Sequence, residues 1–183
     1  MRKALACLLI LALLIACGAA LAEEERVAMR IVTCEEQGFA TLCKPEYDYD
    51  FTPDGGVSIE LGSEIGDPWV SIFKTDAPGA DFDAEYYLAN IYSQEIAGSA
   101  DQVVNPGEVT SLTLGGKALT ALMTFYVTDG ESRYSICAYD LQPDYFVRYE
   151  ARCAGEDIAI ETVLTALAVA VGNFQPDANY YSH

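Results

Sequence analysis

Three arginines, Arg133, Arg148 and Arg152, form the one basic cluster of an otherwise acidic sequence. In a predicted meander of antiparallel strands over residues 117–153, the two-residue alternation of side chains places all three on one face. Guanidinium groups among aromatic rings suit an anionic ligand or the carboxylates of a partner protein. The residues predicted to complete this binding site are Tyr126, Tyr139, Phe146 and Glu150.

A second interpretation of the same residues is structural. In it, Arg148 and Arg152 pair with Glu150 and neighbouring acids in an internal lattice of ion pairs that a helix covers. If the binding interpretation is right, replacing both Arg148 and Arg152 by alanine changes at least one interaction of the protein with a ligand or partner.

The sequence assigns no catalytic residue. Its one histidine is His183, at the very end, so Ser-His-Asp and Cys-His arrangements are not expected. The segment SLTLGGKA differs from a phosphate-binding loop, because Ser111 stands where the first glycine is required and Ala118 follows the lysine. We therefore expect a protein that is not an enzyme and uses no cofactor. A hydrolase that uses paired carboxylates is the alternative, since the chain has 28 acidic residues.

Residues 1–22 have the pattern of an export signal. Two basic residues precede an apolar run over residues 4–16, which is too short to span a bilayer, and the sequence ALA at 20–22 is a cleavage site. Residues 14–17, LIAC, also match a bacterial lipobox, in which Cys17 is acylated and becomes the first residue. Both alternatives predict export, either as a secreted protein or as one anchored by lipid at the outer face of the cytoplasmic membrane.

Four cysteines follow this signal: Cys34, Cys43, Cys137 and Cys153. An even number in an exported chain predicts two disulfides, with three possible connectivities. A bond between Cys137 and Cys153 is the least expected, because the strand register puts them on opposite faces. We predict bonds from the first two to the meander, or free thiols where the host does not oxidise its exported proteins. No pair has C-x-x-C spacing, so no metal is expected.

Charge limits the class of partner. The chain after residue 22 keeps all 28 acidic residues but only 8 of the 10 basic ones, so its net charge is −20. A chain this acidic does not suit nucleic acid or anionic membrane surfaces, which need clustered cations. We expect an unidentified protein or a small anionic ligand as partner, and contact with a membrane only through a lipid at Cys17.

The meander has the clearest local pattern. Asp129-Gly130 is a strong signal for a two-residue hairpin turn, and Gln142-Pro143-Asp144 is a second turn. These turns pair Phe125 with Tyr134 and Ala138 with Tyr149. One face of the meander is then apolar, and the other carries the arginines.

The rest of the chain predicts further strands and two helices in a single domain over residues 26–176, followed by a flexible tail at 177–183. Strands are expected within 26–43, 46–61, 68–74 and 108–114. A helix over 82–97 has an apolar stripe that includes Tyr87 and Ile91, and residues 99–106 form a polar connection. A closing helix over 157–173 buries Ile160, Val163, Leu164, Leu167 and Val171.

The order of these elements, the GGKA turn at 115–118 and the amphipathic helix that ends in Asn173-Phe174 resemble the PsbP-type family, which includes small exported bacterial lipoproteins. The resemblance covers residues 46–175 and leaves out residues 26–43 and the cysteines. It implies an α+β fold, an α/β/α sandwich in which two main helices pack on an antiparallel sheet. It also implies a binding or assembly role, without catalytic residues. We expect a non-catalytic binding or accessory protein of the cell envelope, with a hydrolase or a purely structural envelope protein as alternatives.

Overall fold

The computed structural model describes residues 28–62 and 68–182. The predicted export signal, with its two cleavage alternatives and Cys17, lies outside the described residues. Within them, no helix combines the length and the apolar character that a bilayer crossing requires.

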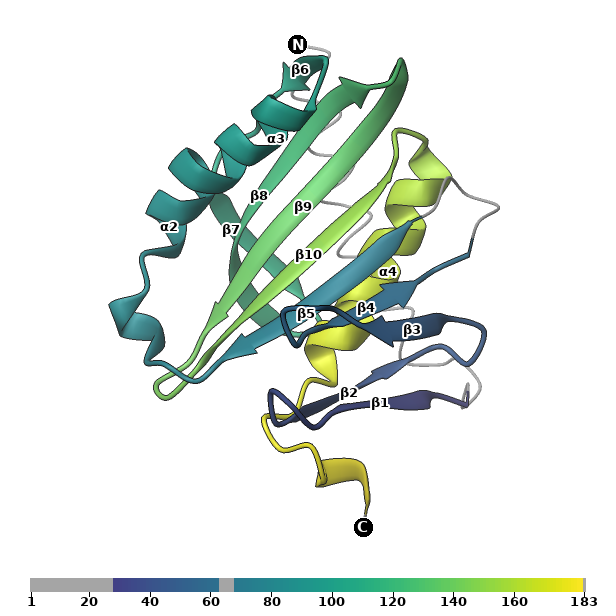
Figure 1. The fold of residues 1–183 in the computed structure, drawn as a ribbon, viewed down its shortest axis with the longest axis vertical. Helices are drawn as coiled ribbons and strands as arrows, with labels where there is room; N and C mark the ends of the chain where they lie inside the picture. Colours follow the sequence, from purple (N-terminus) through teal and green to yellow (C-terminus); the bar gives the residue numbers. More distant parts are fainter. Residues whose placement is uncertain (1–27, 63–67, 183) are drawn as a thin grey trace.

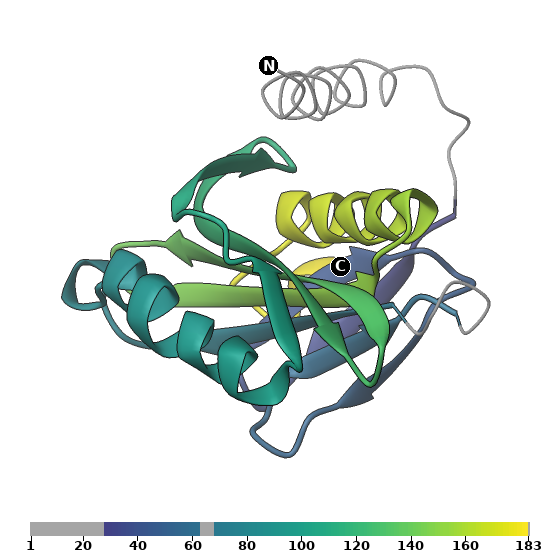
Figure 2. The ribbon, with the colours of Figure 1, turned by 90° about the horizontal axis from the view of Figure 1, so that it is seen from above.

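The described residues form one large antiparallel sheet with helices on both faces (Figures 1 and 2). The sheet has eight strands in the order β3-β4-β5-β10-β9-β8-β6, and β7 pairs with the first half of β8, beyond the part that β6 occupies. The strands are β3 (Asp48–Phe51), β4 (Val57–Glu60), β5 (Trp69–Thr75), β6 (Gln102–Asn105), β7 (Thr110–Leu114), β8 (Lys117–Thr128), β9 (Glu131–Leu141) and β10 (Phe146–Ala154).

The first two strands form a hairpin of their own, β1 (Arg30–Cys34) and β2 (Phe39–Cys43), which packs on the closing helix α4 (Asp157–Gly172). The Thr41 hydroxyl donates to the Ala170 carbonyl, 2.8 Å away. The backbones of Ala40 and Gln175 exchange two hydrogen bonds of 2.9 and 2.8 Å. Beyond them, the predicted tail contains a short 3-10 turn, η4 (Tyr180–Ser182).

The meander has the predicted register. Phe125 pairs with Tyr134, and Ala138 pairs with Ala121 on one side and Tyr149 on the other. Asp129 and Gly130 have φ of 51° and 75°, as a two-residue hairpin turn of the primed type requires. The predicted α+β fold class is therefore confirmed, with the three long strands at its centre.

The two faces of the sheet have separate hydrophobic clusters. One face packs against α4 and the β1–β2 hairpin, and includes Ile136, Ala138, Tyr149 and Ala151 of the meander. The opposite face packs against a helical segment over residues 84–99, where Leu122, Tyr126, Cys137 and Tyr139 are buried. In Figure 1 this segment lies along β8, while α4 lies behind the sheet.

The winding of that segment differs from the prediction. It consists of α2 (Ala84–Tyr86), a π-helical stretch η3 (Tyr87–Tyr92) and α3 (Ser93–Ser99). The amide of Ser93 donates to the carbonyl of Leu88, which is an i to i+5 bond. The buried positions therefore recur every four residues, at 84, 88, 92 and 96, and Ile91 is 39% exposed instead of buried.

One further prediction was wrong in detail. Residues 99–106 were expected as a polar connection, but Gln102–Asn105 form β6 against β8. In α4, the small side chains of Ala159, Ala166 and Ala170 are buried, and the β1–β2 hairpin packs on this helix.

All four described cysteines are buried free thiols, so the predicted bonds from Cys34 and Cys43 to the meander are not formed. Each thiol lies in a different environment. Cys34 donates to the Gly55 carbonyl, Cys43 lines a depression beside α4, and Cys137 lies under the helical segment. Cys153 is on the α4 face of β10, so the sheet separates it from Cys137, as the register predicted.

Gly115 provides a test of how tightly α4 fits. Its φ is +54°, and a Cβ there would lie within 2.5 Å of the Ala168 carbonyl oxygen and against the backbone of Gly172. Gly116 is the matched control, because its φ is +79° and a Cβ there would meet nothing within 4 Å.

We expect Gly116→Ala to lower the free energy of unfolding by about 1 to 2 kcal/mol, for the left-handed backbone alone. Gly115→Ala should cost about 1 to 3 kcal/mol more, because backbone must move. Urea unfolding of both variants measures this difference, and equal losses would contradict the close approach.

The thiols provide a second test. Burial raises the pKa of Cys34 and Cys43 and raises the pKa of Cys153 to about 11, so at pH 8 these thiols are protonated as well as inaccessible. We expect iodoacetamide at pH 8 to modify none of Cys34, Cys43, Cys137 and Cys153 in the folded protein. In denaturant without reductant it should modify all four, as counted by intact mass. Denatured protein that keeps four thiols blocked as disulfides would contradict the structure.

Candidate functional site

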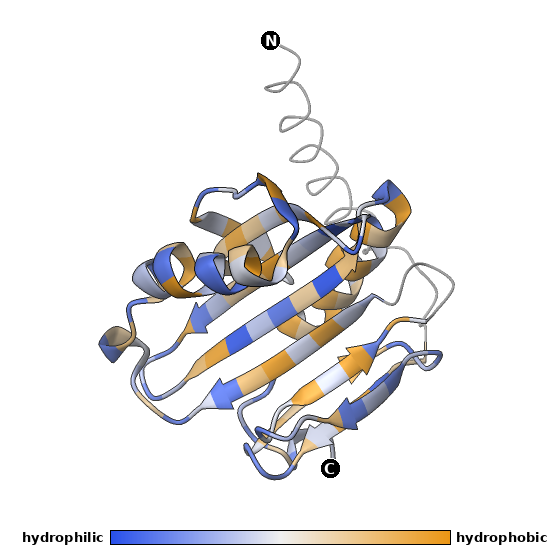
Figure 3. Cartoon of the chain, turned by 45° about the horizontal axis from the view of Figure 1, so that its top comes forward, coloured by the Kyte–Doolittle hydropathy of each residue, from blue (hydrophilic) through white to orange (hydrophobic). Residues whose placement is uncertain are grey.

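The predicted arginines lie on the face of the sheet that carries the helical segment, but on strands beyond it. Arg148, Glu150 and Arg152 alternate along β10. Their neighbours on β5 are Phe73, Ser71 and Trp69, respectively. We call these six residues the arginine face. In Figure 1, β10, β5 and β4 lie beside the helical segment with no helix in front of them, and Figure 3 shows hydrophilic and hydrophobic residues alternating along the strands of this open face.

Arg148 is held by aromatic rings. Its guanidinium carbon lies 4.3 Å from the centre of the Phe73 ring. The Phe73 ring itself lies against Gly56, the residue before β4, since a Cβ on Gly56 would be 2.5 Å from two ring atoms. Tyr87 of η3 and Tyr139 of β9 also lie close to Arg148, whose charge partly offsets the rise that burial causes in the pKa of both hydroxyls. The arginine is thus stacked on one ring and bordered by two phenols.

Arg148 also differs from the other basic residues in its ionic contacts. Each of the other Lys and Arg side chains within residues 28–62 and 68–182 has a carboxylate oxygen within 4.0 Å, and Arg148 has none. Its Nε is buried without a hydrogen-bond partner in this part of the chain. The pKa of this half-buried cation is lowered by burial but raised more by Glu150 and the phenols, and no carboxylate of the described residues within 4.0 Å occupies its guanidinium. Arg148 is therefore a suitable contact for an anionic group.

Arg152 is paired, and the pair anchors the helical segment. Its Nη2 donates to Glu150 Oε1 over 2.9 Å, and its guanidinium lies 5.5 Å from the centre of the Trp69 ring. The Tyr92 hydroxyl reaches Glu150 Oε1 at 3.3 Å and also bonds to the Ser135 hydroxyl. Both Tyr92 and Arg152 thus donate to the same carboxylate oxygen of Glu150. An ion pair with Glu150 therefore exists at Arg152, beside the helical segment and not under it, and Arg148 has no carboxylate within 4.0 Å in the described residues.

Burial and charge keep the groups of this site in their ordinary protonation states. Burial tends to lower the pKa of Arg148, but Glu150 and the neighbouring phenols raise it more, so the net pKa is raised. Burial is the first cause, and Glu150 the second, of the strongly raised pKa of Tyr92. Burial likewise raises the pKa of Tyr87 and Tyr139. The arginine is a permanent cation, and the phenols stay protonated hydrogen-bond donors.

The other predicted site residues lie outside the arginine face. Tyr126 and Tyr139 are only 4% and 3% exposed, because the helical segment packs over them. Phe146 stacks on Phe82, with ring centres 4.5 Å apart. Arg133 pairs with Glu131 near the hairpin turn. Of the predicted set, the structure brings Arg148, Glu150 and Arg152 together as a partly accessible group.

The sequence did not identify the aromatic partners of the arginines. The predicted site did not include Trp69, Phe73, Tyr87 or Tyr92, and Tyr87 was expected only in the apolar stripe of the helix over 82–97. The available signal was the alternation of Trp69, Ser71 and Phe73 along β5, which marks one face of that strand. The pairing of β5 with β10 could not be seen, because these strands are far apart in the sequence.

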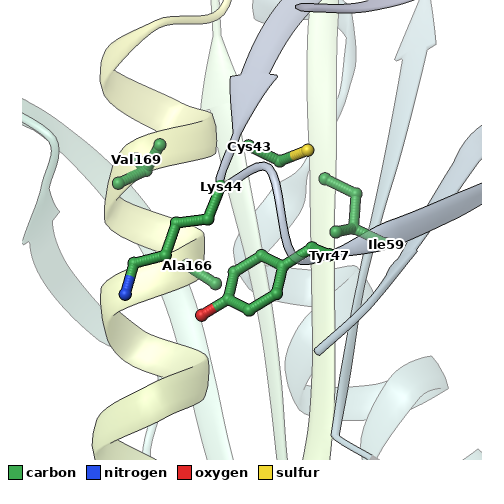
Figure 4. Close-up of a pocket in the computed structure, with 6 residues that line it drawn as sticks. All are labelled: Cys43, Lys44, Tyr47, Ile59, Ala166 and Val169. Atoms are coloured by element: carbon green, nitrogen blue, oxygen red, sulfur yellow. The ribbon is translucent and has the colours of Figure 1, made fainter. Parts of the chain in front are cut away.

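A second feature carries no binding argument. Figure 4 shows a depression between the β1–β2 hairpin and α4, lined by Cys43, Lys44, Tyr47, Ile59, Ala166 and Val169. It is too narrow to admit a water molecule, and Lys44 lies over the Tyr47 ring at 5.8 Å. Within residues 28–62 and 68–182, no three His, Cys, Asp or Glu side chains gather in a way that would hold a metal.

Comparison with known proteins gives a fold. No family model matches the sequence, and no curated protein matches it. The solution structure of CyanoP, the cyanobacterial PsbP of Synechocystis sp. PCC 6803, matches with a TM-score of 0.52 and 10% identity, over 85% of this chain and 98% of that one. The crystal structure of LpqN, which is involved in cell envelope biogenesis in Mycobacterium tuberculosis, matches with a TM-score of 0.50 and 14% identity, over 82% and 91%.

A structure from Bacteroides thetaiotaomicron VPI-5482 matches with a TM-score of 0.49 and 10% identity, over 82% of this chain and 48% of that one, so this chain spans about half of its length. The matches to CyanoP and LpqN confirm the resemblance on which the sequence analysis relied, at the level of the fold. The chain has a PsbP-like α+β fold.

Proposed function

We propose that this protein is an exported, non-catalytic binding or accessory protein of the bacterial cell envelope, and that it holds an anionic group of its partner at Arg148. The observation that carries the proposal is the state of Arg148. It is stacked on Phe73 and lacks a carboxylate within 4.0 Å in the described part of the chain. A carboxylate is the simplest group that supplies what this guanidinium lacks.

Two considerations support the envelope as the location. The sequence begins with the pattern of an export signal, and a protein of similar fold, LpqN, is involved in cell envelope biogenesis. The proposal includes both cleavage alternatives, so the protein is either secreted or anchored through lipid at Cys17. With its net charge of −20 after residue 22, nucleic acid is not a partner in this proposal.

The hydrolase alternative has less support. A glycosidase needs two carboxylates that face each other across the scissile bond. The buried acids of the described residues are Asp140 and Glu150, which are 3% and 9% exposed. They lie on opposite faces of the sheet, and each is paired with a cation, Lys117 at 3.1 Å and Arg152 at 2.9 Å.

The test is a titration of the mature protein with sodium acetate and with inorganic phosphate at constant ionic strength. Arg148→Ala should weaken anion binding about tenfold or more, because a charge-assisted hydrogen bond contributes about 1.5 to 3 kcal/mol. Trp69 is the one tryptophan and lies on the arginine face, so its fluorescence reports binding.

The matched control is Arg30→Ala, which removes the same charge from the β1–β2 hairpin, where Arg30 pairs with Asp48 at 3.7 Å. Its affinity for acetate should equal that of the wild type. If Arg148→Ala binds as well as the wild type, or if both arginine variants lose the same affinity, the site at Arg148 is wrong.

A further inference from the structure

The arginine face has a regular order of charge. Along β10, Arg148, Glu150 and Arg152 point to the same side of the sheet, so the sign of the charge alternates plus, minus, plus. Alternate residues of a strand are about 6.7 Å apart. An extended peptide has the same spacing, so a segment with the order acid, base, acid at every second residue places each charge opposite its complement.

The surroundings of Glu150, the central charge of this row, decide whether the basic residue of such a peptide can reach it. The middle row across the strands continues from Glu150 to Ser71 and Ser58, whose side chains are small. Glu150 is 9% exposed and Ser71 is 6% exposed, so the approach to Glu150 is narrow. On the other side, Tyr92 and Arg152 both donate to Glu150 Oε1, and neither of them bonds to Oε2. A basic side chain of the bound peptide can therefore hydrogen-bond to Oε2.

Other classes of ligand fit less well. Phe73 lies between Gly56, the residue before β4, and the Arg148 guanidinium, so its ring has no open face for a sugar or a nucleobase. Arg152 occupies one face of the Trp69 ring. A polyanion would be repelled by Glu150 at the centre of the row and by the net charge of −18 on the whole chain. A ligand that carries both signs of charge avoids this repulsion.

We infer that the arginine face binds an extended peptide segment of a partner protein in which acidic, basic and acidic residues occupy alternate positions. This inference rests on the proposed function, since Arg148 supplies the first contact. It adds to that function the chemistry of the partner and gives Glu150 a role as the residue that determines specificity. Arg148 and Arg152 bind the two acids, and Glu150 selects the base between them.

The experiment uses two capped heptapeptides of equal composition and charge, Thr-Glu-Thr-Lys-Thr-Glu-Thr and its rearranged form Thr-Thr-Glu-Glu-Lys-Thr-Thr. Each is titrated into the mature protein at low ionic strength, and Trp69 fluorescence is followed. The alternating peptide should bind the wild type at least about threefold more tightly, as expected for one additional, partly exposed ion pair. Equal affinities for the two peptides would overturn the inference.

Two variants separate this inference from the proposed function. Glu150→Gln keeps the shape of the side chain and an acceptor for Tyr92 and Arg152, and it should abolish the preference for the alternating peptide while acetate binding persists. If Glu150→Gln keeps the preference, the specificity role is wrong and the anion site at Arg148 still stands. If Arg148→Ala leaves both acetate and peptide affinities unchanged, the proposed function fails as well. Circular dichroism of each variant, with Arg30→Ala alongside, verifies that the fold is retained.

Discussion

The arrangement of the molecule depends on the register of β8, β9 and β10. Because side chains alternate along a strand, the pairing of Phe125 with Tyr134 and of Ala138 with Tyr149 fixes which side of the sheet every residue of the meander faces. Tyr149 and Ala151 then pack under α4, while Glu150 and its two neighbouring arginines face the other way. A shift by a single residue would turn the guanidinium groups toward the larger core, where burial of a charged group is costly. The binding surface is therefore a consequence of how the core is ordered.

The helical segment covers only part of the face on which these arginines lie, and this division gives the face its character. Over β8 and β9 it buries Tyr126, Cys137 and Tyr139 in a small apolar cluster. At its border, Tyr92 inserts a hydroxyl between Ser135 and Glu150 and so fixes the ion pair with Arg152. Beyond the border, the β5 rings support the guanidinium groups from the side, which limits their rotamers without neutralising their charge. The result is a charged and partly dehydrated surface whose side chains are already held in place. Such a surface loses little conformational entropy when a ligand binds.

The sequence was most informative where the signal is local. The turn at Asp129-Gly130 and the alternation along the meander predict its register, and the periodicity of the closing helix predicts its position. The π-helical stretch was missed because an apolar stripe with a period of 3.6 residues and one with a period of four differ at a single position, Ile91. The strand β6 was missed because its edge position tolerates polar residues. The partners of Arg148 and Arg152 depend on β5 lying next to β10, a contact between distant parts of the chain that no local pattern encodes.

The β1–β2 hairpin also links the two ends of the described chain. Ala40 and Gln175 exchange backbone hydrogen bonds, and Thr41 reaches the last turn of α4 through the Ala170 carbonyl. Neither end can fray alone, because detaching the hairpin exposes the alanine side of α4 and releasing the end of α4 removes the partner of β2. The amino-terminal hairpin and the final helix thus form one cooperative unit, and a mechanical pull at the amino end would have to break long-range contacts before any strand of the large sheet could be peeled away.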